Sequence, residues 1–137
     1  GGVRIPHNKA LAAHSDGDVA LHALSDALLG AAALGDIGRH FSPSDPQWAG
    51  ADSRDLLRKV DVLLKHNGWA VTNIDITLVC ELPKITPHAA QMQANIAADL
   101  GLETTDISIK ATTTEGLGFC GRGEGITATA IVLIKSW

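Results

Sequence analysis

Hydrophobic positions follow a helical period in three segments of the chain. Residues 18–35 carry the first pattern, with Ser15 as the expected N-cap of the helix. Residues 52–68 carry the strongest apolar stripe and end in Asn-Gly, a typical helix stop. Residues 86–101 carry the third pattern, with Thr86 as N-cap and Pro87 in the first turn. Each segment is therefore predicted to form an α-helix.

Alternating apolar and polar positions predict strands at residues 74–80, 107–111 and 126–134. Residues 1–6 are expected to be the tail of a further strand or hairpin. Residues 38–50 hold two prolines, two serines and two glycines, which predicts a mobile loop. Helices mixed with strands, two of which are joined directly, favour an α+β fold, in which a mixed sheet is covered by helices mainly on one face.

Composition narrows the class of protein. Of the 137 residues, 45% are hydrophobic and 19% are charged, a balance that supports one folded domain. A formal net charge of −4 argues against a nucleic-acid partner. The longest apolar stretch, residues 19–34, is interrupted by polar residues, so no membrane-spanning helix is predicted. Cys80 and Cys120, without a secretion signal, predict reduced thiols in a cytoplasmic protein, although one disulfide stays compatible with the sequence.

A first group of chemically active residues lies around the start of the first predicted helix. His14 precedes the helix, where its ring and the adjacent amides could meet an anion. Asp18, His22 and Asp26 are four residues apart and share one helical face, where an imidazole could bind a metal beside an orienting acid. The alternative is a polar, solvated face, because zinc needs three or four ligands and the chain has neither HExxH nor CxxC.

A second group is the glycine-rich segment 111–125. Three threonines, residues 112–114, end a predicted strand and are followed by Glu115, a pattern that favours a polyphosphate site with a hard divalent ion. Residues 116–121 match G-x-G-x-x-G, but the chain ends too soon for a dinucleotide-binding unit. An ordinary glycine-rich turn is the alternative. Lys84 could meet a phosphate, and a solvated loop lysine is the simpler interpretation.

Two long motifs relate the chain to a known family. They are HSDGDVALHALSDALLGAAALGDIG at residues 14–38 and KATTTEGLGFCGRGEG at residues 110–125, with a D-S-R-x-L-L segment and a P-K loop between them. Together they closely resemble the 2-C-methyl-D-erythritol 2,4-cyclodiphosphate synthase family over nearly the whole chain. The resemblance implies a homotrimer with active sites between neighbouring subunits, and a single domain spanning residues 1–137.

The same resemblance implies a reaction in non-mevalonate isoprenoid precursor biosynthesis. The 2-phosphate of 4-diphosphocytidyl-2-C-methyl-D-erythritol 2-phosphate would attack the β-phosphate and expel CMP, which makes the chain a metal-dependent phosphorus–oxygen lyase. Because the nucleophile is already an anion, catalysis is expected to come mostly from alignment and from charge neutralisation across the diphosphate.

Site residues follow from the matched motifs. By this resemblance His14 and Thr113 stabilise the transition state, His22 binds Zn²⁺, and Glu115 helps to hold Mg²⁺ or Mn²⁺. The residues expected to contact substrate are His14, Ser15, Asp36, Ile37, Gly38, Phe41, Asp45, Cys80, Pro83, Lys84, Ile85, Thr86, Thr112, Thr113, Thr114, Glu115, Phe119 and Arg122. Phe119 and Arg122 match positions that line a central channel, where an isoprenoid diphosphate can bind.

The chain departs from the family pattern at two places. The family carries an Asp-x-His on a strand roughly 30 residues before the position of His22, and that pair normally completes the zinc site. Gly1 comes too late for this strand, so we expect an incomplete zinc site, with impaired metal binding and turnover unless the strand exists. In the loop at residues 41–45, Pro43 replaces a common acid. Two alternative functions stay open: a metal-dependent nucleotide phosphohydrolase, and a non-catalytic trimer that binds isoprenoid diphosphates.

Overall fold

A computed structural model describes residues 1–4 and 18–137 of the chain. The larger elements in chain order are α1 (Val19–Ala31), α2 (Ile37–His40), α3 (Ser53–His66), β1 (Trp69–Val79), α4 (Ala89–Leu100), β2 (Ile107–Thr112), α5 (Gly118–Gly121) and β3 (Thr127–Ser136). Three single-turn 3₁₀ helices lie between them: η1 (Pro46–Trp48), η2 (Thr86–His88) and η3 (Thr104–Asp106).

The three strands form a mixed sheet in the order β2-β1-β3. β1 pairs with β2 in parallel and with β3 antiparallel. Although β2 and β3 follow each other along the chain, they flank β1 on opposite sides, so the segment between them crosses the end of the sheet. The predicted α+β architecture with a mixed sheet is confirmed.

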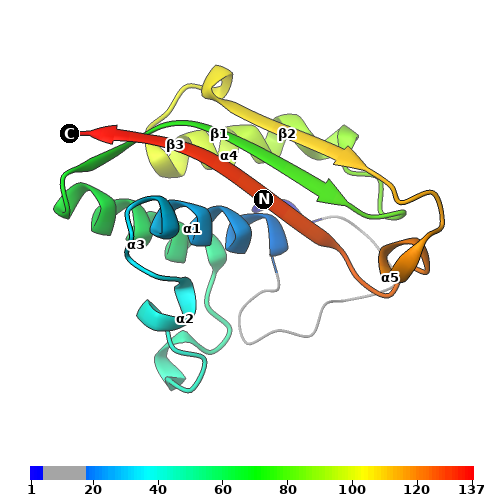
Figure 1. Ribbon diagram of the computed structural model, residues 1–137, viewed down its shortest axis with the longest axis horizontal. Coiled ribbons are helices and arrows are strands. Elements are labelled where there is room, and N and C mark those ends of the chain that lie inside the picture. The colour runs from blue at the N-terminus through cyan, green and yellow to red at the C-terminus, as the bar shows by residue number, and fades with distance from the viewer. Residues whose placement is uncertain (5–17) are drawn as a thin grey trace.

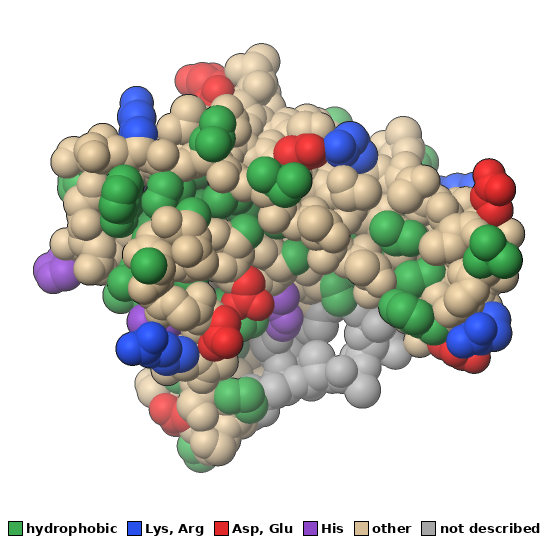
Figure 2. Space-filling model, in the orientation of Figure 1, with side chains coloured by type: hydrophobic (Ala, Val, Ile, Leu, Met, Phe, Trp, Pro, Cys, Tyr) green, Lys and Arg blue, Asp and Glu red, His purple; other side chains and the backbone are tan. Residues whose placement is uncertain are grey.

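Helices α1, α3 and α4 cover one face of this sheet (Figure 1). Side chains on that face are buried, as Ile76 of β1 shows with 0% exposure, because they pack against the apolar stripes of the helices. The opposite face carries Ile131 and Leu133 of β3, which are 67% and 58% exposed. In Figure 2 hydrophobic side chains gather over the strands and over α5 on the face toward the viewer.

Helix α3 agrees most closely with its sequence pattern. Leu57, Val60 and Leu64 are fully buried on its inner side. The Asp52 side chain caps the helix by accepting a hydrogen bond from the backbone N–H of Arg54 at 2.9 Å. A left-handed Gly68, with φ +84°, follows the last turn. Because the cap and the apolar stripe are both clear in the sequence, the helix could be predicted from the sequence alone.

Helix α1 has a different start and end from those predicted. Its N-cap is Asp18, whose carboxylate accepts from the N–H of Leu21 at 3.0 Å, whereas Ser15 lies outside the described residues. The helix ends at Ala31 rather than near Gly35, because the chain turns through left-handed Ala33 and Gly35, with φ +57° and +93°.

Other boundaries also differ from the predictions. β1 begins at Trp69, five residues before the predicted start, and ends at Val79. Thr86 opens the 3₁₀ helix η2 rather than capping α4, which begins at Ala89. The predicted loop at residues 38–50 contains most of α2 and all of η1. Residues 1–4 contain no strand. No helix within the described ranges is long and apolar enough to cross a membrane.

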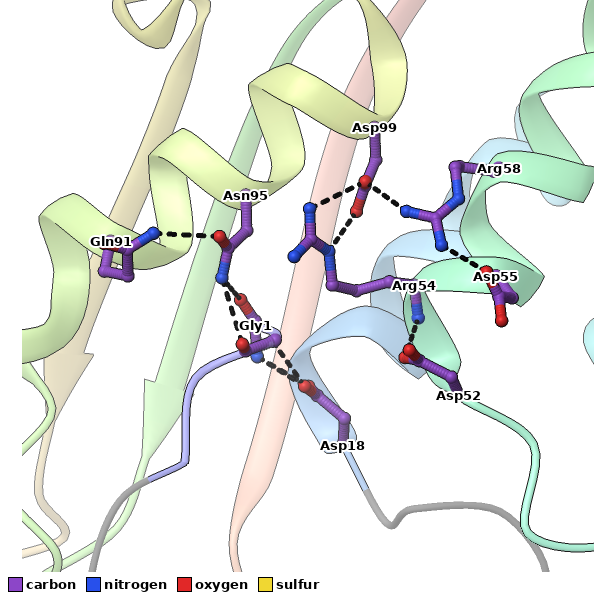
Figure 3. A network of polar contacts seen from close by, with 10 residues as sticks. Gly1, Asp18, Asp52, Arg54, Asp55, Arg58, Gln91, Asn95 and Asp99 are labelled. Atoms are coloured by element: carbon purple, nitrogen blue, oxygen red, sulfur yellow. Dashed lines mark hydrogen bonds and ion pairs between the residues drawn. The ribbon is translucent and has the colours of Figure 1, made fainter.

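Polar contacts join the beginning of the chain to α1 and α4 (Figure 3). The Gly1 amino group and the Gly2 N–H donate to the Asp18 carboxylate at 2.7 Å. From α4, the Asn95 side-chain amide donates to the carbonyls of Gly1 and Gly2, each at 3.1 Å. The first two residues are thus held between the start of α1 and the middle of α4.

A second part of the network joins α3 to α4 (Figure 3). Asp99, whose side chain is only 3% exposed, accepts two hydrogen bonds from Arg54, at 2.8 and 2.9 Å, and one from Arg58 at 2.6 Å. The hydrogen bonds to Asp99 raise the pKa of the Arg54 guanidinium. This bidentate arrangement fixes the two helices against each other behind the sheet.

Candidate functional site

Two segments with predicted site residues, 80–86 and 112–122, lie at the same edge of the sheet. β1 and β2 are parallel, so both end at this edge, and antiparallel β3 begins there, with Val79 paired to both Thr112 and Thr127. The pairing continues one step beyond β1, because the Cys80 N–H donates to the Thr112 carbonyl at 3.1 Å. Residues 80–86 and 112–122 therefore emerge side by side, and α5 lies at the same edge (Figure 1).

The threonine segment forms a turn with an unusual backbone. Glu115 and Gly116 both have left-handed φ angles, +54° and +82°, and the Leu117 N–H donates to the Thr114 carbonyl at 3.1 Å, the pattern of a type I′ turn. A left-handed conformation costs a non-glycine residue about 1 kcal/mol. The Glu115 N–H in turn donates to the Thr113 hydroxyl at 3.2 Å. Backbone strain at a predicted functional residue is typical of sites where the surroundings fix a side chain.

Glu81, directly after Cys80, contacts this turn. Its Oε1 accepts a hydrogen bond from the N–H of Gly116 at 2.9 Å. The hydroxyl of Thr114 donates mainly to the Leu117 carbonyl and lies 3.4 Å from the same Glu81 oxygen. No role was predicted for Glu81 from the sequence, although an acid just after a strand that ends beside the threonine segment was a usable signal.

In the glycine-rich segment, the backbone at Gly121 packs closely against the backbone at Gly116. A Cβ at Gly121 would lie 2.1 Å from the carbonyl carbon of Gly116, so no larger residue fits without moving the turn. The short helix α5 is thereby packed onto the turn that carries Glu115.

In the segment after β1, residues 80–86, some side chains are exposed to solvent and others are buried. Lys84 and Thr86 are exposed, Pro83 is half-buried, and Ile85 is buried. Cys80 is buried, and its Sγ lies 3.7 Å from the Pro83 carbonyl. Burial raises the pKa of the Cys80 thiol, and the nearby Cys120 thiol and Glu81 carboxylate add to the effect.

Both cysteines are free and buried, which agrees with the predicted thiols rather than a disulfide. On the other side of the turn, Thr112, Thr113, Glu115 and Phe119 are exposed at the sheet edge. Arg122 is also exposed, and its guanidinium already pairs with the Glu124 carboxylate at 2.9 and 3.0 Å. An anion in the expected channel would therefore compete with Glu124 for Arg122.

A second group lies on α1 and α3. The Nε2 of His22 is 2.9 Å from the hydroxyl of Ser53, a buried residue at the start of α3. Asp18 caps α1, and Asp26 accepts from the N–H of Ile37 at 2.8 Å. The predicted acid–histidine face is thus used largely for capping and for holding α2. Ser53 was missed because it lies 31 residues from His22 in the sequence.

The expected substrate residues of the next segment form α2 and η1. Asp36 caps α2 by accepting from the Arg39 N–H at 2.9 Å, with Ile37 and Gly38 in its first turn. Asp45 caps η1, and the Phe41 ring packs edge-on against Trp48 at 5.1 Å between ring centroids. These elements lie below α1 in Figure 1, whereas α5 lies at the right-hand end of the sheet. Pro43 falls between α2 and η1.

The donor groups fit the two expected kinds of metal unequally. Glu115 and the neighbouring threonine hydroxyls supply the oxygen ligands that Mg²⁺ and Mn²⁺ prefer, and one carboxylate with substrate phosphates is a common Mg²⁺ arrangement. For Zn²⁺, the described residues hold no group of three or more His, Cys, Asp or Glu in a metal-binding arrangement. His22 supplies one imidazole, which does not by itself make a zinc site. His14 and Ser15 lie outside the described residues.

Comparison with known proteins agrees with the arrangement of these segments. The family model of the YgbB family matches residues 1–135. The 2-C-methyl-D-erythritol 2,4-cyclodiphosphate synthase of Thioalkalivibrio sulfidiphilus is 61% identical over 137 residues, which cover 100% of this chain and 86% of that protein.

Solved structures give the same result. The bifunctional IspDF from Campylobacter jejuni matches with a TM-score of 0.95 and 43% identity, over 99% of this chain and 37% of that longer chain. A 2C-methyl-D-erythritol-2,4-cyclodiphosphate synthase in a CDP-bound form matches with a TM-score of 0.89 and 36% identity, over 98% and 87% of the two chains. With the match of the family model to residues 1–135, these likenesses show that the chain belongs to the YgbB family.

Proposed function

We propose that this chain converts 4-diphosphocytidyl-2-C-methyl-D-erythritol 2-phosphate to 2-C-methyl-D-erythritol 2,4-cyclodiphosphate and CMP. The observation that carries the proposal is the meeting of residues 80–86 and 112–115 at one edge of the sheet. The high identity to relatives named as this synthase supports it, as does the likeness to a synthase in a CDP-bound form.

The two segments suit the two ends of such a substrate. Residues 80–86 offer backbone groups for a cytosine base, and exposed Lys84 offers a charge for a phosphate. Thr112 and Thr113 offer hydroxyls to diphosphate oxygens, and Glu115 would hold Mg²⁺ or Mn²⁺ beside them. When bound, the ion neutralises charge on the α- and β-phosphates.

The residues would then act mainly by alignment. The attacking 2-phosphate is an anion and needs no strong base, so the site must bring it in line with the β-phosphate and screen the charge. Thr113 would donate to the phosphoryl oxygens as the bond to CMP breaks. His14, which lies outside the described residues, is proposed to share this role with Thr113, and Ser15 to lie beside the substrate.

The proposal includes a homotrimer whose sites are shared between subunits. On one chain, α2 lies below α1, whereas α5 lies at the right-hand end of the sheet (Figure 1), as a site built from two chains would require. The uncovered sheet face exposes Ile131 and Leu133. On the same sheet, Asp75 Oδ1 is buried without a hydrogen-bond partner among the described residues, a sign that another surface completes it.

Turnover tests the proposal directly. The protein, with whatever residues precede Gly1 in its gene, is incubated with the cytidyl substrate and Mg²⁺, and the products are followed by phosphorus NMR. The cyclic diphosphate and CMP should form, and Thr113→Ala and Glu115→Ala should lower kcat by about 100-fold or more. Thr104→Ala is the matched control, because Thr104 is an exposed threonine of η3, which precedes β2, whereas the site follows the end of that strand. CMP with a linear diphosphate would instead indicate a phosphohydrolase, and prenyl diphosphate binding without turnover would indicate a carrier.

A further inference from the structure

Glu81 stands out among the charged residues because it connects the two segments of the proposed site. It lies two residues beyond the end of β1, and its carboxylate accepts from the Gly116 N–H, 35 residues later in the chain. One residue before Glu81, the hydrogen bond from the Cys80 N–H to the Thr112 carbonyl already joins the two segments where they leave the sheet. Glu81 thus adds a side-chain link just beyond the last main-chain link.

The turn at residues 113–117, which Glu81 contacts, has a backbone conformation that requires stabilising contacts. Its central residues, Glu115 and Gly116, are both left-handed, and the first of them is not a glycine. A carboxylate that accepts a backbone N–H forms a stronger bond than a neutral acceptor does. The bond is made at Gly116, directly after Glu115, so it constrains the direction in which the Glu115 side chain leaves the turn.

We propose that Glu81 is a positioning residue, which holds the turn at residues 113–117 so that Thr113 and Glu115 face the diphosphate. This inference rests on the proposed function. Because residues 80–86 would bind the cytidine end, Glu81 also ties the position of the base to that of the reacting phosphates. Its loss should lower kcat more than it raises KM, because the contacts with the base need not change.

A pair of substitutions separates the hydrogen bond from the charge. Glu81→Gln keeps an oxygen that can accept from Gly116, whereas Glu81→Ala removes it. We expect Glu81→Ala to lower kcat by about 10- to 100-fold, the effect of small misplacements in an active site, with KM changed much less. Glu81→Gln should retain most of the activity. Glu103→Ala is the matched control, since Glu103 lies at η3, before β2 begins and thus toward the other end of that strand.

A structural readout tests the link without turnover. The Gly116 amide, followed by nitrogen–proton NMR in ¹⁵N-labelled protein, should exchange slowly in the wild type and in Glu81→Gln, and faster in Glu81→Ala. Thermal unfolding of each variant checks that it is folded.

The outcomes are distinct. Unchanged Gly116 exchange in folded Glu81→Ala, or faster exchange with unchanged kcat, would overturn the positioning role. If the wild type makes no cyclic product, the proposed function fails, while Gly116 exchange still decides whether Glu81 holds the turn.

Discussion

The hydroxyl of Ser53, at the start of α3, lies 2.9 Å from Nε2 of His22 on α1. Ser53 is only 1% exposed, so this contact joins two helices inside the helical layer. It also restrains the ring of the residue proposed as a zinc ligand.

Ser53→Ala should therefore destabilise the fold. The substitution removes a hydrogen-bond partner of the imidazole Nε2 and leaves a small gap, which should lower the free energy of unfolding by about 1 kcal/mol. Urea unfolding at a fixed protein concentration measures the change. Ser136→Ala, at an exposed position near the end of β3, should unfold like the wild type. Equal stability of the two variants would contradict a structural role for the contact.

Asp99→Ala should have a larger effect. The carboxylate is 3% exposed and accepts from both Arg54 and Arg58, so its removal leaves two guanidinium groups without their shared partner. These groups are 30% and 44% exposed and regain water, which limits the expected loss to about 1–3 kcal/mol. Chemical unfolding gives the value.

The control for Asp99 is Asp55→Ala. Asp55 pairs with Arg58 on the surface of α3, with its side chain 56% exposed. Its removal should change the unfolding midpoint little, because exposed ion pairs within a helix add little stability. Comparable losses in the two variants would show that burial of Asp99 is not decisive.

How far the sequence predicts the fold depends on whether the signal is local. In α3 the cap at Asp52 and the stripe around Val60 are both encoded within a few residues, and the helix was predicted closely. β1 was predicted to start five residues too late, because a register shift between Val71 and Asn73 breaks the alternation of period two.

The candidate site shows the same limit. A phosphate-binding role for the threonines and Glu115 could be predicted from the sequence, because these residues are contiguous. The bond between Glu81 and Gly116 depends on β1 and β2 pairing in parallel, and the contact of Ser53 with His22 depends on how α1 and α3 pack. No short-range pattern encodes either pairing.

Asp18 should make stability depend on acid pH. In the folded 137-residue chain, burial acts to raise the pKa of Asp18, but the Gly1 ammonium and the hydrogen bonds from Gly2 and Leu21 outweigh it and lower this pKa below 3.8. The stabilisation is therefore present above pH 3.8, and it is lost as pH falls through 3.8 toward the folded pKa, because the unfolded chain binds the proton first.

Urea unfolding of the 137-residue chain, with a free Gly1 amino group, between about pH 6 and about pH 3 measures this dependence. Asp18→Asn should lose less stability over that range, since an amide still caps α1 but does not titrate. Asp36→Asn, at the exposed cap of α2, keeps Asp18 and should retain the steeper loss. Identical slopes for wild type and Asp18→Asn would rule Asp18 out as the source.

The open face of the sheet should determine the oligomeric state. Ile131 and Leu133 point away from the helices, and a lysine at Ile131 would place a charge in the middle of the proposed interface between subunits. Ile131→Lys should therefore convert the proposed trimer to monomers, as measured by light scattering after size-exclusion chromatography, and should abolish turnover, since each proposed site needs two subunits. Val62→Lys is the matched control, because Val62 of α3 is equally exposed, at 65%, but lies on a helix behind the sheet. A wild-type protein that elutes as a monomer, or an Ile131→Lys variant that keeps the wild-type mass, would disprove assembly through this face.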